Sequence, residues 1–487
     1  MISPLKGAII GDMAGEFIGR QKERDRLREC MESSSAQLIV VYGRRRVGKT
    51  FLIDQFFGGR FDFKMTGLYR QPREIQIKAF MDELSMQSKE EHEFPKDWLD
   101  AFIQLRNYLS GLSRDGKHVV FFDEMPWMDT PRSGFLPAFE WFWNGWGAAQ
   151  ANLVLLVCGS ATSWMMDNID NNKGGLFNRQ TCRLYLEPFT LRETEEYLLS
   201  RQISWERYDI AECYMTMGGI PFYLSQLDKK LSYTQNIDNI FFKKRGLLWD
   251  EFPRLYASLF SNGDLYVKVV EALSSKRIGL PRKEITEKTG LPANGGLTRI
   301  LDNLVSTGFV RAYPYYGNKK RETLYQLADY YTMFYYKFIK DNYGRDEAFW
   351  THSMDNPART AWAGFTFEQL CKDHIRQVKE ALGISGVLTE ESSWFLRGGD
   401  GQDGCQIDML IDRRDRVTNL CEMKFSRKEF EIDKDYSRRL QNKIDSFREA
   451  TGTRNTLLLT FITSYGVRQN MYSGRVQAEV TLDQLFS

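Results

Sequence analysis

The stretch QLIVVYGRRRVGKT, residues 37–50, places an apolar run directly before a glycine-rich basic loop. The run QLIVVY contains three β-branched residues, and its apolar residues fall on both faces of a strand. This pattern is typical of a buried strand in a parallel sheet. Residues 43–50 fit the pattern GxxxxGK[ST], in which backbone N–H groups and the N-terminus of the next helix face a phosphate. We therefore predict an α/β fold with a P-loop; the alternative is a glycine turn with a solvated basic loop.

Each residue type in this loop predicts a role at a bound nucleotide. Lys49 is expected to meet the β- and γ-phosphates of ATP, and Thr50 to offer its hydroxyl to Mg²⁺. Gly48 allows the backbone to approach the ligand closely. The three arginines at 44–46 either lean toward phosphate or form a solvated rim. The residues predicted to bind nucleotide in this segment are Gly43, Arg46, Gly48, Lys49, Thr50 and Phe51.

Two further apolar runs end in residues suited to the same site. HVVFFDEMPW, residues 118–127, predicts a buried strand ending in Asp123, whose carboxylate would hold the Mg²⁺ shell. Glu124 follows and is predicted to polarise the attacking water as a general base. A strand-end turn with two solvated acids is the alternative. The run NLVLLVCGSAT, from residue 152, leads to Ser160, which we expect to sense the γ-phosphate from the tip of a third strand.

Five motifs together resemble a known family. FIGRQKERDRL (17–27), the P-loop, FFDE, CGS and GGIPFYL (218–224) are similar to the archaeal-type P-loop ATPases of the STAND/AAA+ group. The resemblance implies an ASCE P-loop core with a helical lid, and ATP and Mg²⁺ as cofactors. It also implies that Phe17, Gly19 and Arg20 lie near the adenine and that Pro221 marks the nucleotide-facing turn of the lid.

One arginine is a candidate for contacting the γ-phosphate across a subunit boundary. Arg179 in GGLFNRQ would act as an arginine finger, which implies a homo-oligomer. Arg183 is a competing candidate, and a surface salt bridge is the bland alternative for either residue.

The segment after the lid predicts three short helices and a hairpin between residues 263 and 327. Three helices followed by a hairpin indicate a winged helix, with Arg299 and Asn303 on the outward side of its third helix. Lys319, Lys320 and Arg321 would stand at the wing tip near a DNA or RNA backbone. Binding to a protein partner is the alternative, since winged helices also serve as protein–protein modules.

The tail contains a second group of chemistry-bearing residues. In CQIDMLIDRRDRVTNLCEMKFS, residues 405–426, two alternating runs flank a charged turn and carry Asp408, Glu422 and Lys424. Glu422 and Lys424 share one strand face and Asp408 lies one hairpin away, so the three side chains can converge. Asp408, Glu422 and the carbonyl of Met423 could then bind Mg²⁺, while Lys424 orients the water that attacks a phosphodiester.

This order of residues resembles the PD-(D/E)xK nuclease core. The resemblance implies a restriction-endonuclease-like α/β domain, in which Glu368 on a preceding helix donates a further acid and Gln441 is an accessory residue. The alternative is an exposed hairpin whose acids and lysine are structural remnants.

Length and composition limit the remaining possibilities. The chain has 487 residues, which favours several domains. Its 66 Lys and Arg against 64 Asp and Glu give a net charge of +2, so any nucleic-acid binding must come from local patches. Seven scattered cysteines without a CxxC pair, and the lack of a long apolar run, predict a cytoplasmic protein with reduced thiols and no membrane contact. The predicted domains are residues 1–187 (P-loop core), 188–255 (helical lid), 256–345 (winged helix) and 346–487 (nuclease-like domain).

Two functions are compatible with these predictions. The first is an ATP-hydrolysing protein that couples nucleotide state to nucleic-acid binding or cleavage by the tail. The second is a STAND-like regulatory ATPase switch, whose winged helix and degenerate tail bind a protein partner. The aromatic run AFEWFWNGWG, residues 138–147, is expected to be a core helix and otherwise a docking helix for that partner.

Overall fold

The structure is a computed structural model that divides into two compact units, Met1–Pro188 and Phe189–Ser487. It describes residues 17–113, 115–170, 175–176, 178–260, 262–314, 323–342, 344–396 and 404–487. Among these residues, no helix has both the length and the apolar character needed to cross a membrane.

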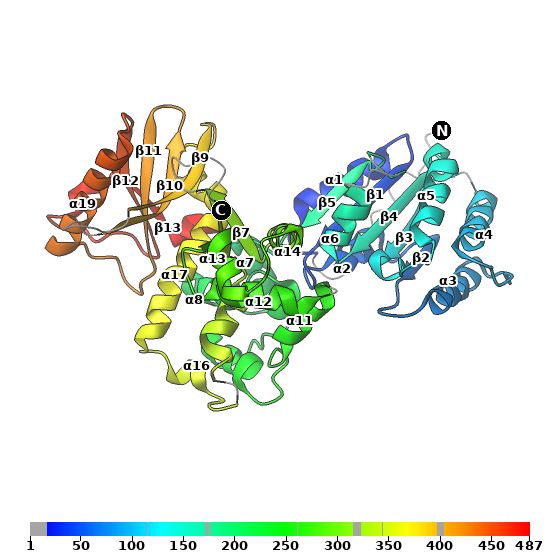
Figure 1. The fold of residues 1–487 in the computed structure, drawn as a ribbon, viewed down its shortest axis with the longest axis horizontal. Coiled ribbons are helices and arrows are strands. Elements are labelled where there is room, and N and C mark those ends of the chain that lie inside the picture. The colour runs from blue at the N-terminus through cyan, green and yellow to red at the C-terminus, as the bar shows by residue number, and fades with distance from the viewer. Residues whose placement is uncertain are drawn as a thin grey trace. The chain divides into compact units, whose positions relative to one another are not determined.

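The first unit contains a five-stranded parallel sheet, which confirms the predicted sheet (Figure 1). Its strands are β1 (Gln37–Gly43), β2 (Phe63–Thr66), β3 (His118–Asp123), β4 (Leu153–Gly159) and β5 (Cys182–Leu186). They lie in the order β2-β3-β4-β1-β5, and every neighbouring pair is parallel. The loop after β1 and the residues after β3 and β4 therefore meet at the carboxyl edge, where ligands bind in open α/β sheets.

Helices cover this sheet on both faces. They are α1 (Gln21–Glu32), α2 (Lys49–Phe57), α3 (Arg73–Ser88), α4 (Trp98–Gly111), α5 (Phe135–Gly145) and α6 (Thr162–Met165). Helices α3, α4 and α5 bury aromatic side chains against Val120 and Phe122. Phe121 points to the opposite face, where Phe61 bridges it to Phe57 of α2 through ring centroids 5.6 and 5.8 Å apart. Both faces of the strands are buried, as their apolar sequence predicts.

Helix α5 carries the aromatic run that was open to two interpretations. Phe139, Phe142 and Trp143 are buried in the core of the first unit, while Trp141 is 37% exposed. Phe139 lies edge-on to Phe122, with ring centroids 6.0 Å apart. The run is therefore a core helix.

The second unit begins with a helical region. Its helices are α7 (Leu191–Ser200), α8 (Arg207–Met217), α9 (Pro221–Leu224), α10 (Tyr233–Ile237), α11 (Glu251–Leu259), α12 (Gly263–Ser274), α13 (Arg282–Thr289) and α14 (Gly295–Ser306). A three-stranded antiparallel sheet follows, in the order β6 (Leu280–Pro281), β8 (Thr323–Leu327) and β7 (Val310–Pro314). The register of the β7–β8 hairpin runs from Val310 opposite Leu327 to Pro314 opposite Thr323.

Four helices lead from this sheet to the last domain: α15 (Tyr330–Phe334), α16 (Phe349–His352), α17 (Pro357–Asp373) and α18 (Ile375–Ala381). A buried ion pair fixes α17 against α8, because a guanidinium nitrogen of Arg359 lies 3.3 Å from Glu212. Arg359 also donates to the carbonyl of Trp350 at 2.9 Å and covers its ring at 4.0 Å.

A second five-stranded sheet ends the chain. Its strands are β9 (Thr389–Leu396), β10 (Cys405–Arg413), β11 (Val417–Lys424), β12 (Thr456–Thr463) and β13 (Ala478–Thr481), in the order β13-β12-β11-β10-β9. Strand β10 pairs antiparallel with both β9 and β11, whereas β12 pairs parallel with both β11 and β13. Helix α19 (Lys434–Thr451) makes the crossover between β11 and β12. Residues Leu410, Leu420 and Phe447 form part of the core under this helix.

Candidate functional site

The loop between β1 and α2 has the backbone of a phosphate-binding turn. Gly43, Arg46 and Gly48 have φ values of 147°, 73° and 90°, so three residues in eight lie in the left-handed region. A Cβ atom on Gly43 would lie 2.4 Å from the carbonyl oxygen of Leu186, whereas one on Gly48 would meet nothing within 4 Å. The curled backbone turns back to start α2 at Lys49, whose first N–H groups have no partner within the helix.

Lys49 is buried at the centre of this loop. Its ammonium donates to the carbonyls of Gly43 and Arg44 and to the hydroxyl of Ser160, each at 3.0 Å. These neutral acceptors hold the charge under the curled backbone. An ammonium supplied with carbonyl and hydroxyl partners alone can exchange some of them for the stronger bond to a phosphate oxygen.

Thr50 and Asp123 form a pair of oxygen ligands beside the loop. The hydroxyl of Thr50 lies 2.9 and 3.1 Å from the two carboxylate oxygens of Asp123. Burial raises the pKa of Asp123, and the charge of Glu124 raises it further. Mg²⁺ prefers such hard oxygen ligands and would relieve the electrostatic cost of the buried acid. The residues present therefore fit a Mg²⁺–nucleotide complex.

Glu124 is held by the tip of the next strand. Its Oε1 accepts the hydroxyl of Ser160 at 2.6 Å, and its Oε2 accepts the backbone N–H of Ser160 at 3.0 Å. Glu124 itself has φ 46°, an uncommon value for a residue with a side chain. Since Ser160 also contacts Lys49, one hydroxyl connects the predicted phosphate-binding cation to the predicted base.

The residues before α1 surround the other side of the loop. Arg20 is buried and donates to the carbonyls of Glu187 at 2.7 Å and Val47 at 3.0 Å, so it braces the P-loop backbone. Phe17 stacks on Phe51 with ring centroids 6.0 Å apart. Phe51 is 58% exposed, which leaves an aromatic surface beside the loop. Gly19, with φ 67°, supplies the turn between Phe17 and Arg20.

Three other predicted residues belong to segments outside the P-loop, the ends of β3 and β4, and the residues before α1. Arg179 is exposed, and Arg183 is exposed on β5, where it donates to the side chain of Gln180 at 3.0 Å. Pro221 is the first residue of α9 in the second unit. Its turn is tight, because a Cβ on Gly219 would lie 2.0 Å from the carbonyl oxygen of Phe189. Their contacts with nucleotide remain predictions.

In the second unit, the structure brings the predicted acids of the tail together on one sheet. The β10–β11 register pairs Met409 with Cys421, so the next residues along, Asp408 and Glu422, face each other across the hairpin. Lys424 follows on the same face of β11, with its ammonium 3.5 Å from Glu422. A register shift on the other side of β10 falls between Ile407 and Leu410. Such irregularities re-aim side chains next to functional sites.

Glu422 is surrounded by donors. Its side chain is 4% exposed, it forms an ion pair with Lys443 of α19, and it accepts the hydroxyl of Tyr436 at 2.8 Å. Burial alone would raise the pKa of Glu422, but Lys443 and Lys424 hold that pKa below its ordinary value. Glu422 is therefore a carboxylate that two ammonium groups neutralise.

The pKa of Glu368 on α17 is shifted in the opposite direction from that of Glu422. Burial raises the pKa of the Glu368 carboxyl to about 8, the charge of Asp408 acts in the same direction, and Lys372 and Lys424 oppose both. Burial and the charge of Arg311 lower the pKa of Lys372 to about 8, against the pull of Asp408 and Glu368. Within the described part of the chain, no three His, Cys, Asp or Glu side chains are grouped closely enough to hold a metal ion.

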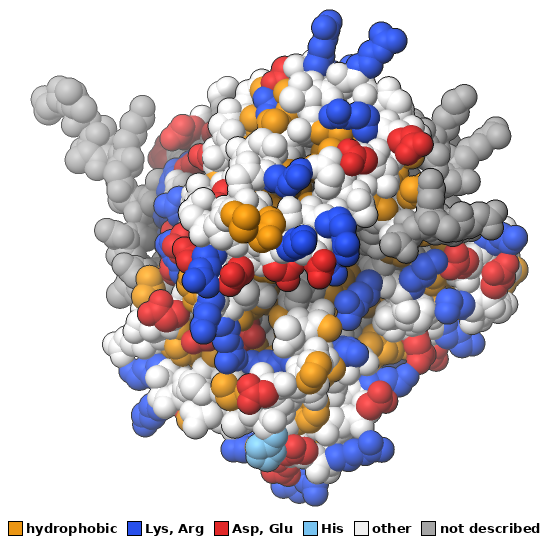
Figure 2. Space-filling view, turned by 90° about the vertical axis from the view of Figure 1, so that its left-hand side faces the viewer, with side chains coloured by type: hydrophobic (Ala, Val, Ile, Leu, Met, Phe, Trp, Pro, Cys, Tyr) orange, Lys and Arg blue, Asp and Glu red, His pale blue; other side chains and the backbone are white. Residues whose placement is uncertain are grey.

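The predicted nucleic-acid contacts of the hairpin region are only partly described. Arg299 is exposed on α14, whereas Asn303 turns to the hydroxyl of Tyr266 at 2.7 Å. Lys319, Lys320 and Arg321 lie outside the described residues. Figure 2 shows Lys and Arg side chains interspersed with Asp and Glu over the face that it draws. This mixture agrees with the small net charge of the sequence.

Comparisons with known proteins bear on the first unit and the region after it. Residues 17–227 match the family of an ATPase domain predominantly from Archaea. An uncharacterized protein of Methanocaldococcus jannaschii, MJECL04, is 24% identical over 413 residues, which cover 84% of this chain and 87% of that protein. The uncharacterized ATP-binding protein MJ0423 of the same organism is 48% identical over 40 residues, 8% of this chain and 68% of that protein.

A solved structure is also similar to the chain. The Walker-type ATPase PABY2304 of Pyrococcus abyssi aligns with a TM-score of 0.47 and 19% identity, over 65% of this chain and 95% of that one. The family match is the comparison that supports an ATPase domain. It spans the P-loop, the acidic pair Asp123 and Glu124 at the end of β3, and Ser160.

Two residues of the tail were missed by sequence reasoning. Tyr436 and Lys443 of α19 reach Glu422, whereas the predicted Gln441 donates to the carboxylate of Asp445 at 2.8 Å. A signal was present, because Tyr436, Leu440, Lys443 and Phe447 recur at helical spacing on the side of α19 that faces the sheet. Gln441 lies off that stripe.

Proposed function

We propose that this chain binds ATP with Mg²⁺ and hydrolyses it, and that nucleotide state controls nucleic-acid binding or cleavage by the C-terminal domain. The observation that carries the proposal is the chain of contacts from Lys49 through Ser160 to Glu124. It connects the group suited to bind the γ-phosphate with the group suited to activate water.

The loop supplies the binding energy for the triphosphate. Lys49 and the first N–H groups of α2 attract the β- and γ-phosphates, and Thr50 and Asp123 hold Mg²⁺. When bound, Mg²⁺ neutralises charge on the β- and γ-oxygens. Phe17 and Phe51 offer an aromatic surface for the adenine.

Glu124 acts as the general base in this proposal. Each of its carboxylate oxygens accepts one hydrogen bond from Ser160 and keeps a lone pair that can accept a proton from the attacking water. A γ-phosphate that draws Lys49 and the Ser160 hydroxyl toward itself weakens their existing contacts. Ser160 then couples ligand binding to the orientation of the base.

Lys49→Ala tests ATP binding, with Lys22→Ala on the exposed face of α1 as the matched control. Calorimetry should show loss of ATP binding in Lys49→Ala alone, while the circular dichroism of both variants matches wild type. Glu124→Gln should bind ATP and release phosphate at a much lower rate, because it keeps the ground-state contacts and loses the base. Wild-type affinity in Lys49→Ala would defeat the proposal.

A second candidate function is metal-dependent phosphodiester cleavage by the tail. Support comes from Asp408 and Glu422, which face each other across the β10–β11 hairpin, and from Glu368, whose pKa is raised by burial first and then by the charge of Asp408. Nearby carboxylates that repel one another are stabilised by a shared cation. Asp408 and Glu422 would hold the metal, and Lys424 would orient the attacking water. In this proposal the region from α12 to β8 is a winged helix that presents the nucleic-acid substrate to the tail.

Cleavage is tested with purified chain, single- and double-stranded DNA and RNA, and Mg²⁺ or Mn²⁺, with and without ATP. Glu422→Gln and Lys424→Ala should each lose cleavage, whereas Lys434→Ala on the exposed side of α19 should keep it. If wild type cleaves no substrate and divalent ions leave its melting temperature unchanged, the regulatory switch with a protein-binding tail is favoured.

A further inference from the structure

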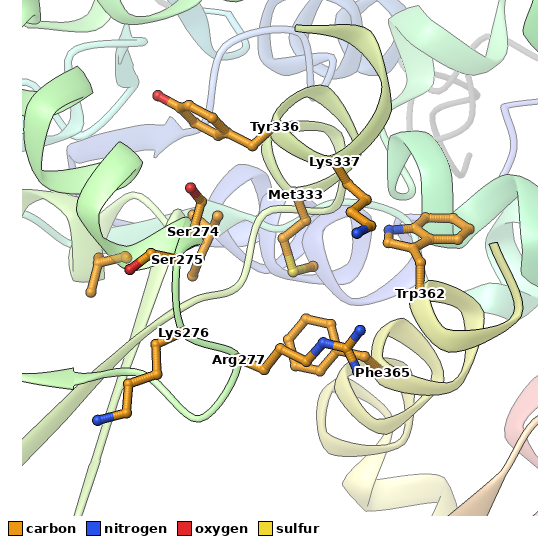
Figure 3. Close-up of a pocket in the computed structure, with 11 residues that line it drawn as sticks. Ser274, Ser275, Lys276, Arg277, Met333, Tyr336, Lys337, Trp362 and Phe365 are labelled. Carbon is orange, nitrogen blue, oxygen red and sulfur yellow. The ribbon is translucent and has the colours of Figure 1, made fainter. Parts of the chain in front are cut away.

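A cavity of about 270 Å³ lies within the second unit, away from the acids of the tail. The end of α12, strand β8, the π-helical segment Tyr335–Ile339 and helix α17 form its walls (Figure 3). The volume is near the lower end of the roughly 300–1,000 Å³ typical of small-molecule sites. The cavity therefore suits a compact ligand.

The charge of the lining favours an anion. Arg277 and Lys337 both line the cavity, and the described lining contains no Asp or Glu. Within the described residues, neither cation has a carboxylate within 4.0 Å, whereas Lys276 at the same wall pairs with Glu284 at 3.1 Å. Both residues are exposed at the lining of the cavity. Two cations without carboxylate partners at one cavity attract a phosphate or carboxylate.

The buried indole N–H of Trp362 also favours a ligand with an acceptor oxygen. Trp362 is 3% exposed, and its indole N–H has no hydrogen-bond partner among the residues that the structure describes. In the view of Figure 3 the indole nitrogen is on the edge of the Trp362 ring that faces Lys337, and both residues line the cavity. The nitrogen itself is covered by neighbouring atoms. A buried N–H without an acceptor is costly, and a ligand oxygen that displaced those atoms would remove that cost.

The position of this donor is fixed by its neighbours. Edge-to-face contacts with Trp350 and Phe338, at centroid distances of 5.6 and 5.5 Å, hold the Trp362 ring. Lys337 belongs to the π-helical segment, and single π turns within helices occur frequently at functional sites. The Trp362 donor and the Lys337 cation thus belong to packed helical elements.

The rest of the cavity is apolar and aromatic. Met333 is buried at its base, and Phe365 lies under the Arg277 guanidinium, whose carbon is 5.5 Å from the ring centroid. We propose that the cavity binds a phosphorylated ring compound of mononucleotide size. Its phosphate contacts Arg277, Lys337 and the Trp362 indole N–H, and its ring lies against Met333 and Phe365.

The test uses the full chain carrying Lys49→Ala, so that the P-loop contributes no nucleotide binding. AMP and inorganic phosphate are the probes, and calorimetry measures their affinities. AMP should bind at one site. Arg277→Gln should weaken its binding about ten- to hundredfold through loss of a charged donor, and Trp362→Phe about three- to tenfold through loss of a neutral one.

Lys283→Gln is the matched control, because this lysine is exposed on α13 outside the cavity. It should leave AMP affinity unchanged. Trp362→Phe should lower the melting temperature of the parent by no more than a few degrees, because the phenyl ring keeps part of the aromatic packing and leaves a small cavity. Absence of AMP binding, or equal AMP affinity in Arg277→Gln and its parent, would overturn the site. Equal affinities for phosphate and AMP would overturn the assignment of the ring. Because every variant carries Lys49→Ala, these outcomes are independent of ATP hydrolysis.

Discussion

The hydroxyl of Ser160 lies 2.6 Å from Oε1 of Glu124, and the same hydroxyl accepts the Lys49 ammonium at 3.0 Å. Ser160 is 7% exposed, so both contacts are shielded from water. A carboxylate held in this way has a defined orientation before any substrate arrives. Loss of the hydroxyl should therefore affect the chemical step more than nucleotide binding.

Ser160→Ala should lower the kcat of ATP hydrolysis about ten- to a hundredfold, while ATP affinity changes by no more than a few fold. Glu124→Gln should lower kcat about 10²–10⁴-fold, the usual contribution of a positioned base. Steady-state phosphate release and calorimetry give the two quantities. Ser133→Ala, which removes another buried hydroxyl, is the control and should keep the wild-type rate. A wild-type rate in Ser160→Ala would show that Glu124 needs no positioning by this side chain.

Two glycines of the P-loop should differ in what their substitution costs. Gly43→Ala places a Cβ 2.4 Å from the Leu186 carbonyl oxygen and strains a backbone at φ 147°, so the unfolding free energy of the first unit should fall by roughly 2–5 kcal/mol. Gly48→Ala meets no atom within 4 Å, and only its φ of 90° is strained, at a cost of about 1–2 kcal/mol.

The effect on ATP binding should be larger for Gly48→Ala, although its effect on stability is smaller than that of Gly43→Ala. Gly48→Ala places its methyl group where the loop backbone would approach a phosphate, so it should lose ATP binding while the chain remains folded. Urea unfolding followed by fluorescence, with calorimetry on the folded variants, separates the two effects. If both alanines destabilise the first unit equally, the contact with Leu186 does not govern the need for Gly43.

His374 should make the second unit sensitive to acid. Its Nε2 accepts the N–H of Leu191 at 3.0 Å and its Nδ1 lies 2.9 Å from the carbonyl of Leu370, so the ring is held neutral. Burial lowers the pKa of His374, against smaller opposing effects of Leu370 and Asp373. Between the unfolded pKa of about 6.5 and the lower folded pKa, the unfolded chain binds more protons. Stability is thus present above pH 6.5 and is lost as the pH falls below it.

The slope from this one proton is at most about 1.4 kcal/mol per pH unit. His374→Gln should reduce the loss of melting temperature between pH 6.5 and 5, and should lower the melting temperature at pH 7.5. The measurement is thermal unfolding across this pH range. Parallel pH profiles for wild type and His374→Gln would show that other groups control the acid response.

The sequence allowed the parallel sheet and the residues of the P-loop to be predicted because those signals are local. An apolar run, a glycine with positive φ and a helix start are all encoded within residues 37–50. The convergence of Asp123, Glu124 and Ser160 beside the P-loop follows from strand order, since β4 lies next to β1 and β3 lies next to β4. The functional roles of these residues remain predictions.

The tail was harder to predict because its contacts depend on the rotation of α19. Gln441 and Lys443 are two positions apart, about 200° around a helix, so only one can face the sheet. Lys443 does so, and its charge changes the state of Glu422. The cavity beside Trp362 had no sequence signal, because its walls come from four elements between residues 273 and 365.

Lys443 should compete with a divalent ion for Glu422. Its ammonium forms an ion pair with Oε1 of this buried carboxylate, and Lys424 and Tyr436 engage Oε2. A metal bound between Asp408 and Glu422 must displace or share the contact with Lys443. Lys443→Met keeps most of the side-chain volume and removes the charge, so it should raise the affinity for Mn²⁺ by at least about tenfold.

The same substitution should destabilise the chain when metal is absent. Removing one partner of a buried ion pair typically costs about 3–5 kcal/mol, and the remaining Lys424 should reduce that cost. Mn²⁺ should then restore the melting temperature of Lys443→Met more than it raises that of wild type, and Asp408→Asn in the same background should remove the effect. Lys434→Met, on the exposed side of α19, controls for loss of a lysine on this helix. Lys443→Met has lost the competing charge and keeps both carboxylates. If Mn²⁺ changes the melting temperature of neither wild type nor this variant, Asp408 and Glu422 therefore share no cation.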